Sequence, residues 1–298
     1  MVISDDKSSQ IVELTDGRRL GYAEYGDPRG RPIFYFHGNY GSRLEALFGK
    51  ENYLVEKGIR FVCMDRPGLG LSDYQAKRLL LDWPIDVLEL ATHLNIDKFA
   101  VMGGSGGGPY ALACTHEIPP NRLTGCLIVS GLGPYSLSKE GMNRRSKNML
   151  VFARRFPWAF RFALWIMMGR KAKQENVKWW EENYQKLYQS LPEPDQKLVL
   201  EPSIRERMIL KTLEAFRQGS KGPAHDFKLY TKPWGFELHE IPEELTVFLF
   251  HGGLDTSVPI SMARTMSEQI PNCKTKFYPE EGHLSVLINR FDEIFSSL

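Results

Sequence analysis

Short runs of apolar, β-branched and aromatic residues alternate with amphipathic stretches along most of the chain. The runs predict strands at residues 10–14, 20–25, 32–36, 59–64, 99–102, 125–130, 245–250 and 275–278. Helical patterns occur between them, at residues 44–57, 82–94, 109–116 and 260–270, and again at the end of the chain. Alternating strands and helices predict an α/β fold with a mainly parallel sheet and helices on both of its faces.

The pattern changes in the middle of the chain. Between residues 134 and 234 the sequence predicts no convincing strand. It predicts helical or irregular segments that are rich in aromatic residues. We therefore expect a core formed by residues 1–133 and 235–298, with an all-helical cap at residues 134–234 inserted after the sixth strand of the sheet. Because cap helices must bury an apolar face, most of these aromatic side chains are expected to pack against the core and against each other.

Composition narrows the class of protein. A chain of 298 residues is long enough for one large α/β domain or for a domain that carries an insertion. A formal net charge of +2 argues against extensive binding to nucleic acid. The four cysteines have no C-x-x-C spacing, which favours free thiols and a reducing compartment. With no leader-like N-terminus and no apolar stretch of roughly 18 residues, we expect a soluble cytoplasmic protein without a transmembrane segment.

The strongest chemical signal follows the strand predicted at residues 99–102. Gly103, Ser105 and Gly107 fit the pattern G-x-S-x-G, and Pro109 opens the next helical stretch. This pattern places a serine at the apex of a sharp turn between strand and helix. The N-terminus of the helix supplies free N–H groups where an oxyanion forms. Taken alone, such a glycine-rich turn is also compatible with phosphate binding.

A serine hydroxyl becomes nucleophilic when a base takes its proton, and the base needs a third group to fix its tautomer. On a strand–turn–helix scaffold the partners follow in the order serine, acid, histidine, each after a strand. His283 follows the strand predicted to end at residue 278, and Asp255 follows the strand before it. The other possible acid position, at residues 131–135, contains no carboxylate. Asp226 is a weaker alternative acid, and we favour a helix-capping or solvent-exposed position for it.

Taken together, these segments resemble the α/β-hydrolase superfamily. The matching pieces occur in the order of the family and cover both halves of the chain except the cap: His37-Gly38, residues 65–73, residues 103–107, Gly253-Leu-Asp255 with Val258-Pro259, and Gly282-His283. The resemblance implies an eight-stranded, mostly parallel sheet under a helical lid. It also implies that Ser105 is the nucleophile, His283 the base and Asp255 the orienting acid.

The same resemblance places the oxyanion hole at the backbone N–H groups of Asn39 and Gly106. These groups would meet the negative charge of a tetrahedral intermediate. Tyr40 and His37 flank Asn39 and are candidates for lining the pocket, although a structural role that fixes the loop is the favoured interpretation of His37.

The resulting functional hypothesis is a carboxylesterase-like serine hydrolase that acts on a small-molecule ester or related acyl compound and needs no cofactor and no metal. Ser105 argues against the epoxide- and halide-processing relatives, which use a carboxylate nucleophile. The loop His37-Gly-Asn-Tyr-Gly41 departs from the His-Gly-Gly-Pro-Gly of proline-iminopeptidase-like relatives, which argues against a peptidase. A C–C bond hydrolase, a lyase, and a ligand-binding receptor that retains the triad stay open as alternatives.

The cap is strongly basic. Between Lys139 and Lys186 there are twelve Lys or Arg residues, four Glu and no Asp, a local charge of +8. A solvated cationic face is the favoured interpretation, and attraction of acidic substrates or of an anionic lipid surface is the alternative. Residues 152–165, in which arginines separate aromatic residues, have the composition of an interfacial helix. The sequence does not fix the oligomeric state.

Overall fold

The computed structural model describes residues 7–45, 50–173 and 177–298. Eight strands form one sheet in the order β1-β2-β4-β3-β5-β6-β7-β8. β2 is antiparallel to β1 and to β4, and the remaining neighbours are parallel. The strands are β1 (Gln10–Glu13), β2 (Arg19–Gly26), β3 (Arg31–Phe36), β4 (Ile59–Met64), β5 (Phe99–Gly104), β6 (Leu123–Val129), β7 (Val247–Gly252) and β8 (Cys273–Tyr278). The predicted eight-stranded, mostly parallel sheet is confirmed.

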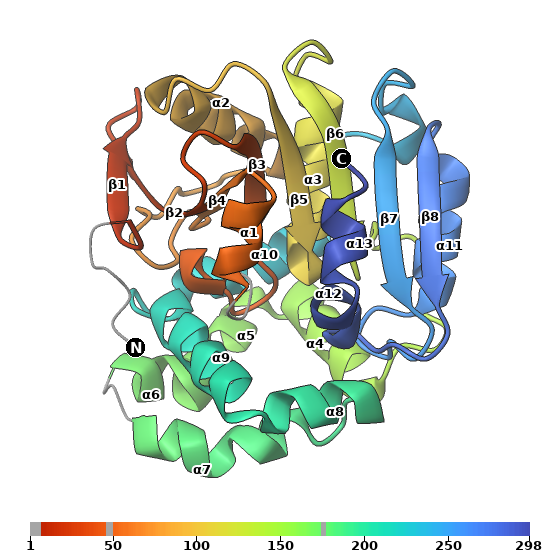
Figure 1. Ribbon diagram of the computed structural model, residues 1–298. Coiled ribbons are helices and arrows are strands. Elements are labelled where there is room, and N and C mark those ends of the chain that lie inside the picture. The colour runs from red at the N-terminus through yellow and green to blue at the C-terminus, as the bar shows by residue number, and fades with distance from the viewer. Residues whose placement is uncertain (1–6, 46–49, 174–176) are drawn as a thin grey trace.

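Helices cover both faces of this sheet (Figure 1). α2 (Trp83–His93), α3 (Gly108–Glu117) and α11 (Ile260–Gln269) pack on one face, and α1 (Glu51–Glu56), α12 (Ser285–Asn289) and α13 (Phe291–Phe295) pack on the other. Along β3 the side chains alternate between the two cores, with Phe34 and Phe36 on the first and Ile33 and Tyr35 on the second. This alternation buries the strand on both sides, which explains its continuous apolar sequence.

Two predicted helices differ in detail. The helix predicted at residues 44–57 lies partly outside the described residues, and the described parts are the short 3₁₀ turn η1 (Arg43–Glu45) and α1. The final helix is divided into α12 and α13. Arg290 caps the end of one and the start of the other, with φ of −106° and ψ of 18°.

Seven α-helices come between β6 and β7 in the described chain. They are α4 (Arg144–Arg155), α5 (Pro157–Leu164), α6 (Arg170–Lys173), α7 (Val177–Tyr188), α8 (Glu193–Leu200), α9 (Pro202–Ala215) and α10 (Lys221–Tyr230), with the π-helical turn η5 (Trp165–Gly169) between α5 and α6. In Figure 1, α4 to α9 lie below the carboxyl ends of the parallel strands, where active sites of open α/β sheets are found. The exact limits of the cap, residues 134–234, stay a prediction.

The aromatic residues of the cap divide into two groups. Trp180 and Tyr184 are buried in an apolar cluster with residues of α8 and α9, and Phe160 packs on Phe227 of α10. Trp158 and Phe162 are instead 76% and 57% exposed. The expectation that most of these side chains are buried is therefore wrong for the outer side of α5, because only one side of this helix faces the rest of the protein.

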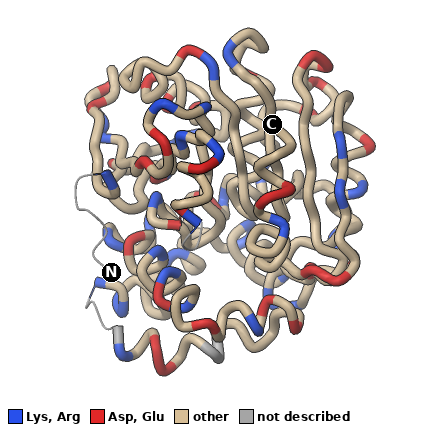
Figure 2. Tube along the Cα trace, in the orientation of Figure 1, with Lys and Arg blue, Asp and Glu red and all other residues tan. Residues whose placement is uncertain are grey.

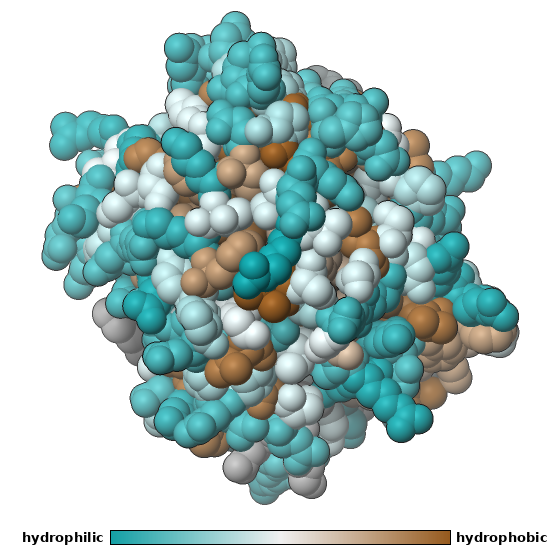
Figure 3. Space-filling model, turned by 90° about the vertical axis from the view of Figure 1, so that its right-hand side faces the viewer, coloured by the Kyte–Doolittle hydropathy of each residue, from teal (hydrophilic) through white to brown (hydrophobic). Residues whose placement is uncertain are grey.

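The edge of the sheet at β8 is protected by charge. Lys274 and Lys276 are exposed on this strand, and lysines on an edge strand discourage pairing with a second chain. Hydrophilic residues cover most of the face that carries β8 and α11 (Figure 3). None of the described helices is long and apolar enough to cross a membrane.

Candidate active site

Ser105 lies at the sharp turn between β5 and α3, at the first position of η4 (Ser105–Gly107). Its φ of +51° is in the left-handed region, which a non-glycine residue seldom adopts. A Cβ on Gly103 would lie 2.4 Å from the carbonyl oxygen of Gly107, and one on Gly107 would lie 1.9 Å from that of Phe36. The glycines on either side are required because the backbone passes too closely for a side chain.

The structure brings together the three residues that the sequence places far apart. Nε2 of His283 lies 2.9 Å from Oγ of Ser105, and Nδ1 lies 2.7 Å from Oδ2 of Asp255. The other carboxylate oxygen of Asp255 accepts hydrogen bonds from the backbone N–H groups of Ser257 and Val258. A carboxylate held in this way keeps the proton of the imidazole on Nδ1, so that Nε2 presents a lone pair to the serine hydroxyl.

The loop that carries Asn39 is fixed from two sides. The backbone N–H of Gly38 donates to Oε1 of Glu45 over 2.9 Å, and the Arg66 guanidinium donates to the carbonyl oxygens of His37 and Gly38. Burial disfavours the ionised form of Glu45, but Lys211, 2.6 Å away, together with His37 and the N–H of Gly38 outweighs this effect, so that the pKa of Glu45 falls to about 2. An ionised Glu45 thus holds the start of the loop in place.

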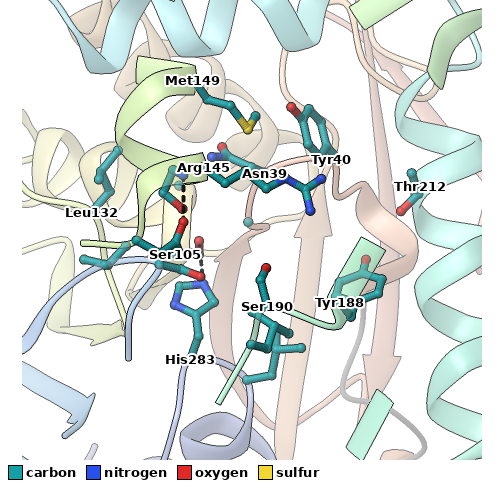
Figure 4. A pocket seen from close by; sticks show the side chains of 18 of the residues that line it. Asn39, Tyr40, Ser105, Leu132, Arg145, Met149, Tyr188, Ser190, Thr212 and His283 are labelled. Carbon is teal, nitrogen blue, oxygen red and sulfur yellow. Dashed lines mark hydrogen bonds between the residues drawn. The ribbon is translucent and has the colours of Figure 1, made fainter. Parts of the chain in front are cut away.

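Asn39 and Gly106 lie next to each other at the end of this loop. A Cβ on Gly106 would be only 2.2 Å from Oδ1 of Asn39. A Cβ on Gly38 would be 3.2 Å from the Cβ atom of Ser105. The two residues expected to form the oxyanion hole therefore meet beside the serine. Figure 4 shows Asn39 near Ser105 and His283 in the same cavity.

The family model for the alpha/beta hydrolase fold matches residues 31–289 of the chain. The chain belongs to the alpha/beta hydrolase family. A probable proline iminopeptidase from Leptolyngbya boryana is 32% identical over 127 residues, which is 42% of this chain and 38% of that protein. The proline iminopeptidase of Arabidopsis thaliana is 29% identical over 128 residues, which is 42% of this chain and 33% of that protein. The matches thus span well under half of the length of these relatives.

Among solved structures, the chain is similar to an esterase from Exiguobacterium antarcticum. The TM-score is 0.68 over 97% of both chains, with 18% sequence identity. This likeness is one of fold.

Ser105 faces a cavity of about 240 Å³ between the sheet and the cap (Figure 4). Its apolar walls come largely from the cap and include Met149, Leu150, Met168, Tyr188, Leu191, Met208 and Phe227. Of the two residues expected to line the pocket, Tyr40 does so and packs on Phe216 and Phe227. His37 is 1% exposed behind the loop, and burial lowers its pKa to about 3, so it is a neutral residue inside the fold.

Asp226 is not the acid partner of His283. Its carboxylate is 2% exposed and forms ion pairs with Arg66 and Arg78, and it accepts a hydrogen bond from the hydroxyl of Tyr110. Burial raises its pKa, but the two arginines outweigh burial and lower the pKa to about 2. The expectation of a helix-capping or exposed position is wrong, because Asp226 neutralises a buried pair of cations.

Sequence reasoning missed a further carboxylate at the site, Asp195 of α8 in the cap. Its two oxygens accept hydrogen bonds from the backbone N–H groups of His283, Leu284 and Ser285, at 2.7, 2.9 and 2.9 Å. Asp195 is fully buried, and a Cβ on Gly282 would lie 2.5 Å from its Oδ2. A cap residue therefore fixes the segment that carries His283. Gly282 directly before His283 is the one sequence signal of such a close approach.

Charges around His283 come from several elements. Burial favours its neutral form, but the Asp255 and Asp195 carboxylates together outweigh this effect, so that the pKa of His283 is raised above the usual 6.5. Lys211 of α9 acts in the opposite direction. His251, which is fully buried 3.4 Å from Asp255, has a pKa lowered by burial and by His283 as well. No group of His, Cys, Asp and Glu side chains suited to a metal ion occurs among the described residues.

These charges predict a pH profile. The protonated imidazole cannot accept the serine proton, so kcat/KM for a neutral ester should fall on acidification, with a midpoint above 6.5 because the pKa of His283 is raised. Asp195→Asn should move this midpoint to lower pH, since it removes a negative charge near the imidazolium. It should also lower kcat by about 10- to 100-fold, as three N–H groups lose a charged acceptor.

The matched control is Glu193→Gln, which removes an exposed carboxylate paired with Lys197 in the same helix. Its pH–rate profile should match that of the unaltered protein. A role for Asp195 in stability alone would lower the melting temperature of Asp195→Asn and leave its midpoint unchanged, and that result would contradict the assignment.

Proposed function

We propose that the protein is a serine hydrolase that cleaves esters or related acyl compounds through an acyl-enzyme on Ser105. The observation that carries this proposal is the continuous hydrogen-bonded chain from Ser105 Oγ through His283 to Asp255, at the floor of a cavity. Such a chain serves to make a serine nucleophilic.

In the proposed reaction Ser105 Oγ attacks the carbonyl carbon as its proton passes to Nε2 of His283. The carbonyl oxygen becomes an oxyanion, and the backbone N–H groups of Asn39 and Gly106 stabilise it there. His283 then protonates the leaving alkoxide, which leaves as an alcohol, and Asp255 stabilises the imidazolium in between. Water, deprotonated by the same imidazole, cleaves the acyl-enzyme and releases the acid.

The charges of the cavity favour an ester over the peptide substrate of an iminopeptidase. A free N-terminal ammonium group calls for carboxylates in the pocket. Glu45 is the one carboxylate among the described lining residues, and it already binds Lys211, the hydroxyl of Tyr35 and the N–H of Gly38. Arg145 and Lys211 line the same cavity. This balance of charge repels a cationic substrate.

The test is steady-state turnover of p-nitrophenyl esters of increasing acyl length, compared with a prolyl arylamide. We expect turnover of the esters, with kcat/KM highest for short acyl chains. A cavity of about 240 Å³ is smaller than the roughly 300–1,000 Å³ of pockets for drug-sized ligands. The prolyl arylamide should be hydrolysed at least about 100-fold less efficiently, a ratio that the unmet ammonium group justifies.

Faster hydrolysis of the prolyl arylamide would establish the iminopeptidase, which the curated relatives favour. A single stoichiometric release of p-nitrophenol without further turnover would favour a ligand-binding receptor that retains the triad.

A further inference from the structure

The cap carries a surface on which apolar and cationic side chains are exposed together. Every exposed Phe and Trp side chain among the described residues lies in α4, α5, η5 or the junction between α4 and α5. Ile166 and Met167 directly follow Trp165 in the chain and are exposed as well, Met167 to 58%. The surface consists of Val151, Phe152, Phe156, Trp158, Phe162, Trp165, Ile166 and Met167. Large apolar side chains gathered in this way mark an interaction site.

The arrangement follows from helical geometry. Trp158, Phe162 and Trp165 are spaced four and three residues apart, so they lie on one side of α5 and η5. The rings of Phe162 and Trp165 stack with centroids 5.9 Å apart. Phe160 and Leu164 point to the opposite side and are buried. This part of the cap thus has one side that belongs to the core and one that presents aromatic rings outward.

An open groove of about 770 Å³ runs along this outer side. Trp158, Phe162 and Trp165 line it with aromatic rings, and residues 217–220 between α9 and α10 line it together with Lys221, the first residue of α10. The groove is lined by four cationic side chains, those of Arg161, Lys173, Arg217 and Lys221. None of its described lining residues is acidic. Arg217 lies 3.4 Å from Glu214, and Lys221 stacks over the ring of Tyr74.

The sequence around this surface contains basic residues but no acidic ones. From Arg144 to Lys173 the chain contains nine Lys or Arg residues and no Asp or Glu. Lys and Arg occupy three of the four positions of α6, which appears as a blue segment in Figure 2. The Arg170 guanidinium lies 5.6 Å from the ring of Trp165, so cations adjoin the exposed aromatic rings directly.

We infer that this surface docks onto an anionic lipid bilayer. Aromatic and aliphatic side chains enter the interfacial region while neighbouring Lys and Arg side chains meet anionic headgroups. A second copy of this chain would bring the same excess of cations against each other, which opposes a symmetric dimer through this face. Val151, Ile166 and Met167 also favour a bilayer over nucleic acid, since aliphatic side chains contribute nothing to stacking on bases. The inference concerns where the protein binds and is independent of its substrate.

The experiment measures co-sedimentation of the full chain with vesicles. Vesicles of phosphatidylcholine mixed with phosphatidylserine are compared with vesicles of pure phosphatidylcholine, from low to high salt. We expect binding to the anionic vesicles that weakens as salt rises, because headgroup attraction is screened beyond about 8 Å at physiological ionic strength. Pure phosphatidylcholine should bind much less protein.

Two variants separate the contributions of charge and apolar contact. Replacing Arg161, Lys173 and Lys221 by Gln should weaken binding about a hundredfold, since each cation near an anionic surface contributes a factor of about five. Trp158→Ser combined with Phe162→Ser should weaken binding roughly tenfold or more at every salt concentration.

The matched control replaces three other exposed cations, Arg29, Lys98 and Lys274, by Gln. These residues lie at the amino ends of β3, β5 and β8, opposite the cap, and the control changes the net charge by the same amount. Its binding should stay within about twofold of the unaltered protein, because headgroup attraction falls off within a Debye length. Vesicle binding by a Ser105→Ala protein should also be unchanged, which makes this test independent of the proposed hydrolysis.

The inference is overturned by absence of binding to anionic vesicles at low salt, or by equal loss of binding in the charge variant and the control. Sedimentation velocity tests the alternative that a second copy of the chain binds to this surface. A concentration-dependent dimer that the Trp158→Ser, Phe162→Ser protein no longer forms would assign this surface to a second copy of the chain.

Discussion

Ser105→Ala is expected to lower kcat for p-nitrophenyl esters by about 10⁴-fold or more while the protein stays folded. The hydroxyl of Ser105 is the group that faces Nε2 of His283, at 2.9 Å. Without it no acyl-enzyme can form, and what turnover remains comes from binding and from the oxyanion hole alone. Alanine at a φ of +51° carries about the same backbone strain as serine, so the turn should be retained.

The control for this variant is Ser267→Ala, which removes an exposed hydroxyl on α11 that donates to the carbonyl oxygen of Arg264. Its turnover should equal that of the unaltered protein. Melting curves of both variants and labelling by a fluorophosphonate complete the test. Ester turnover by Ser105→Ala near the normal rate would exclude the proposed nucleophile.

The sequence predicts the sheet well because strands buried on both faces have an unambiguous pattern. Residues 32–36 form a continuous apolar run and residues 59–64 form one that only Arg60 interrupts, and the two runs coincide closely with β3 and β4. The local sequence also locates Ser105, since the glycines around it are needed where neighbouring backbone segments pass too closely for a side chain. The order of the partners after their strands places Asp255 and His283, which the structure brings within hydrogen-bonding distance of each other.

Contacts between the cap and the core could not be predicted in this way. Asp195 lies 88 residues before His283 and accepts its N–H, yet nothing in the sequence around α8 distinguishes it from a surface carboxylate. The predicted position of Asp226, capping a helix or facing solvent, is wrong for the same reason, since its partner Arg66 is 160 residues away. Periodicity reports which side of an element is apolar. It does not report which partner a buried charge meets, because that depends on how distant elements pack.

The outer side of α5 is a different case. Residues 152–165 have the composition of an interfacial helix, but the same composition fits a helix buried inside a lid. Exposure of Trp158 decides between them, and exposure is a property of the fold. The groove beside it also needs residues 217–221, which come from the loop after α9 and the first position of α10 and cannot be assigned to the groove from the sequence of α5.

Asp255→Asn should lower kcat by about 10⁴-fold, through the tautomer of His283. Oδ1 of Asp255 accepts the N–H groups of Ser257 and Val258, so in the variant the amide oxygen takes that position and the amide nitrogen faces Nδ1. An N–H donor at this position requires a lone pair on Nδ1, which moves the imidazole proton to Nε2. An imidazole with a proton on Nε2 cannot take the proton of Ser105.

The comparison is Asp226→Asn, whose effect should be on stability. It leaves the buried Arg66 and Arg78 without their carboxylate, and breaking a buried ion pair costs about 3–5 kcal/mol. Its melting temperature should therefore fall, whereas kcat of the folded fraction should decrease far less than in Asp255→Asn. The midpoint of the acid limb supplies a second readout. It should shift to lower pH in Asp255→Asn, which loses the charge that raises the pKa of His283, and stay in place in Asp226→Asn. If both variants are folded and Asp226→Asn is the slower enzyme, Asp255 is not the residue that orients His283.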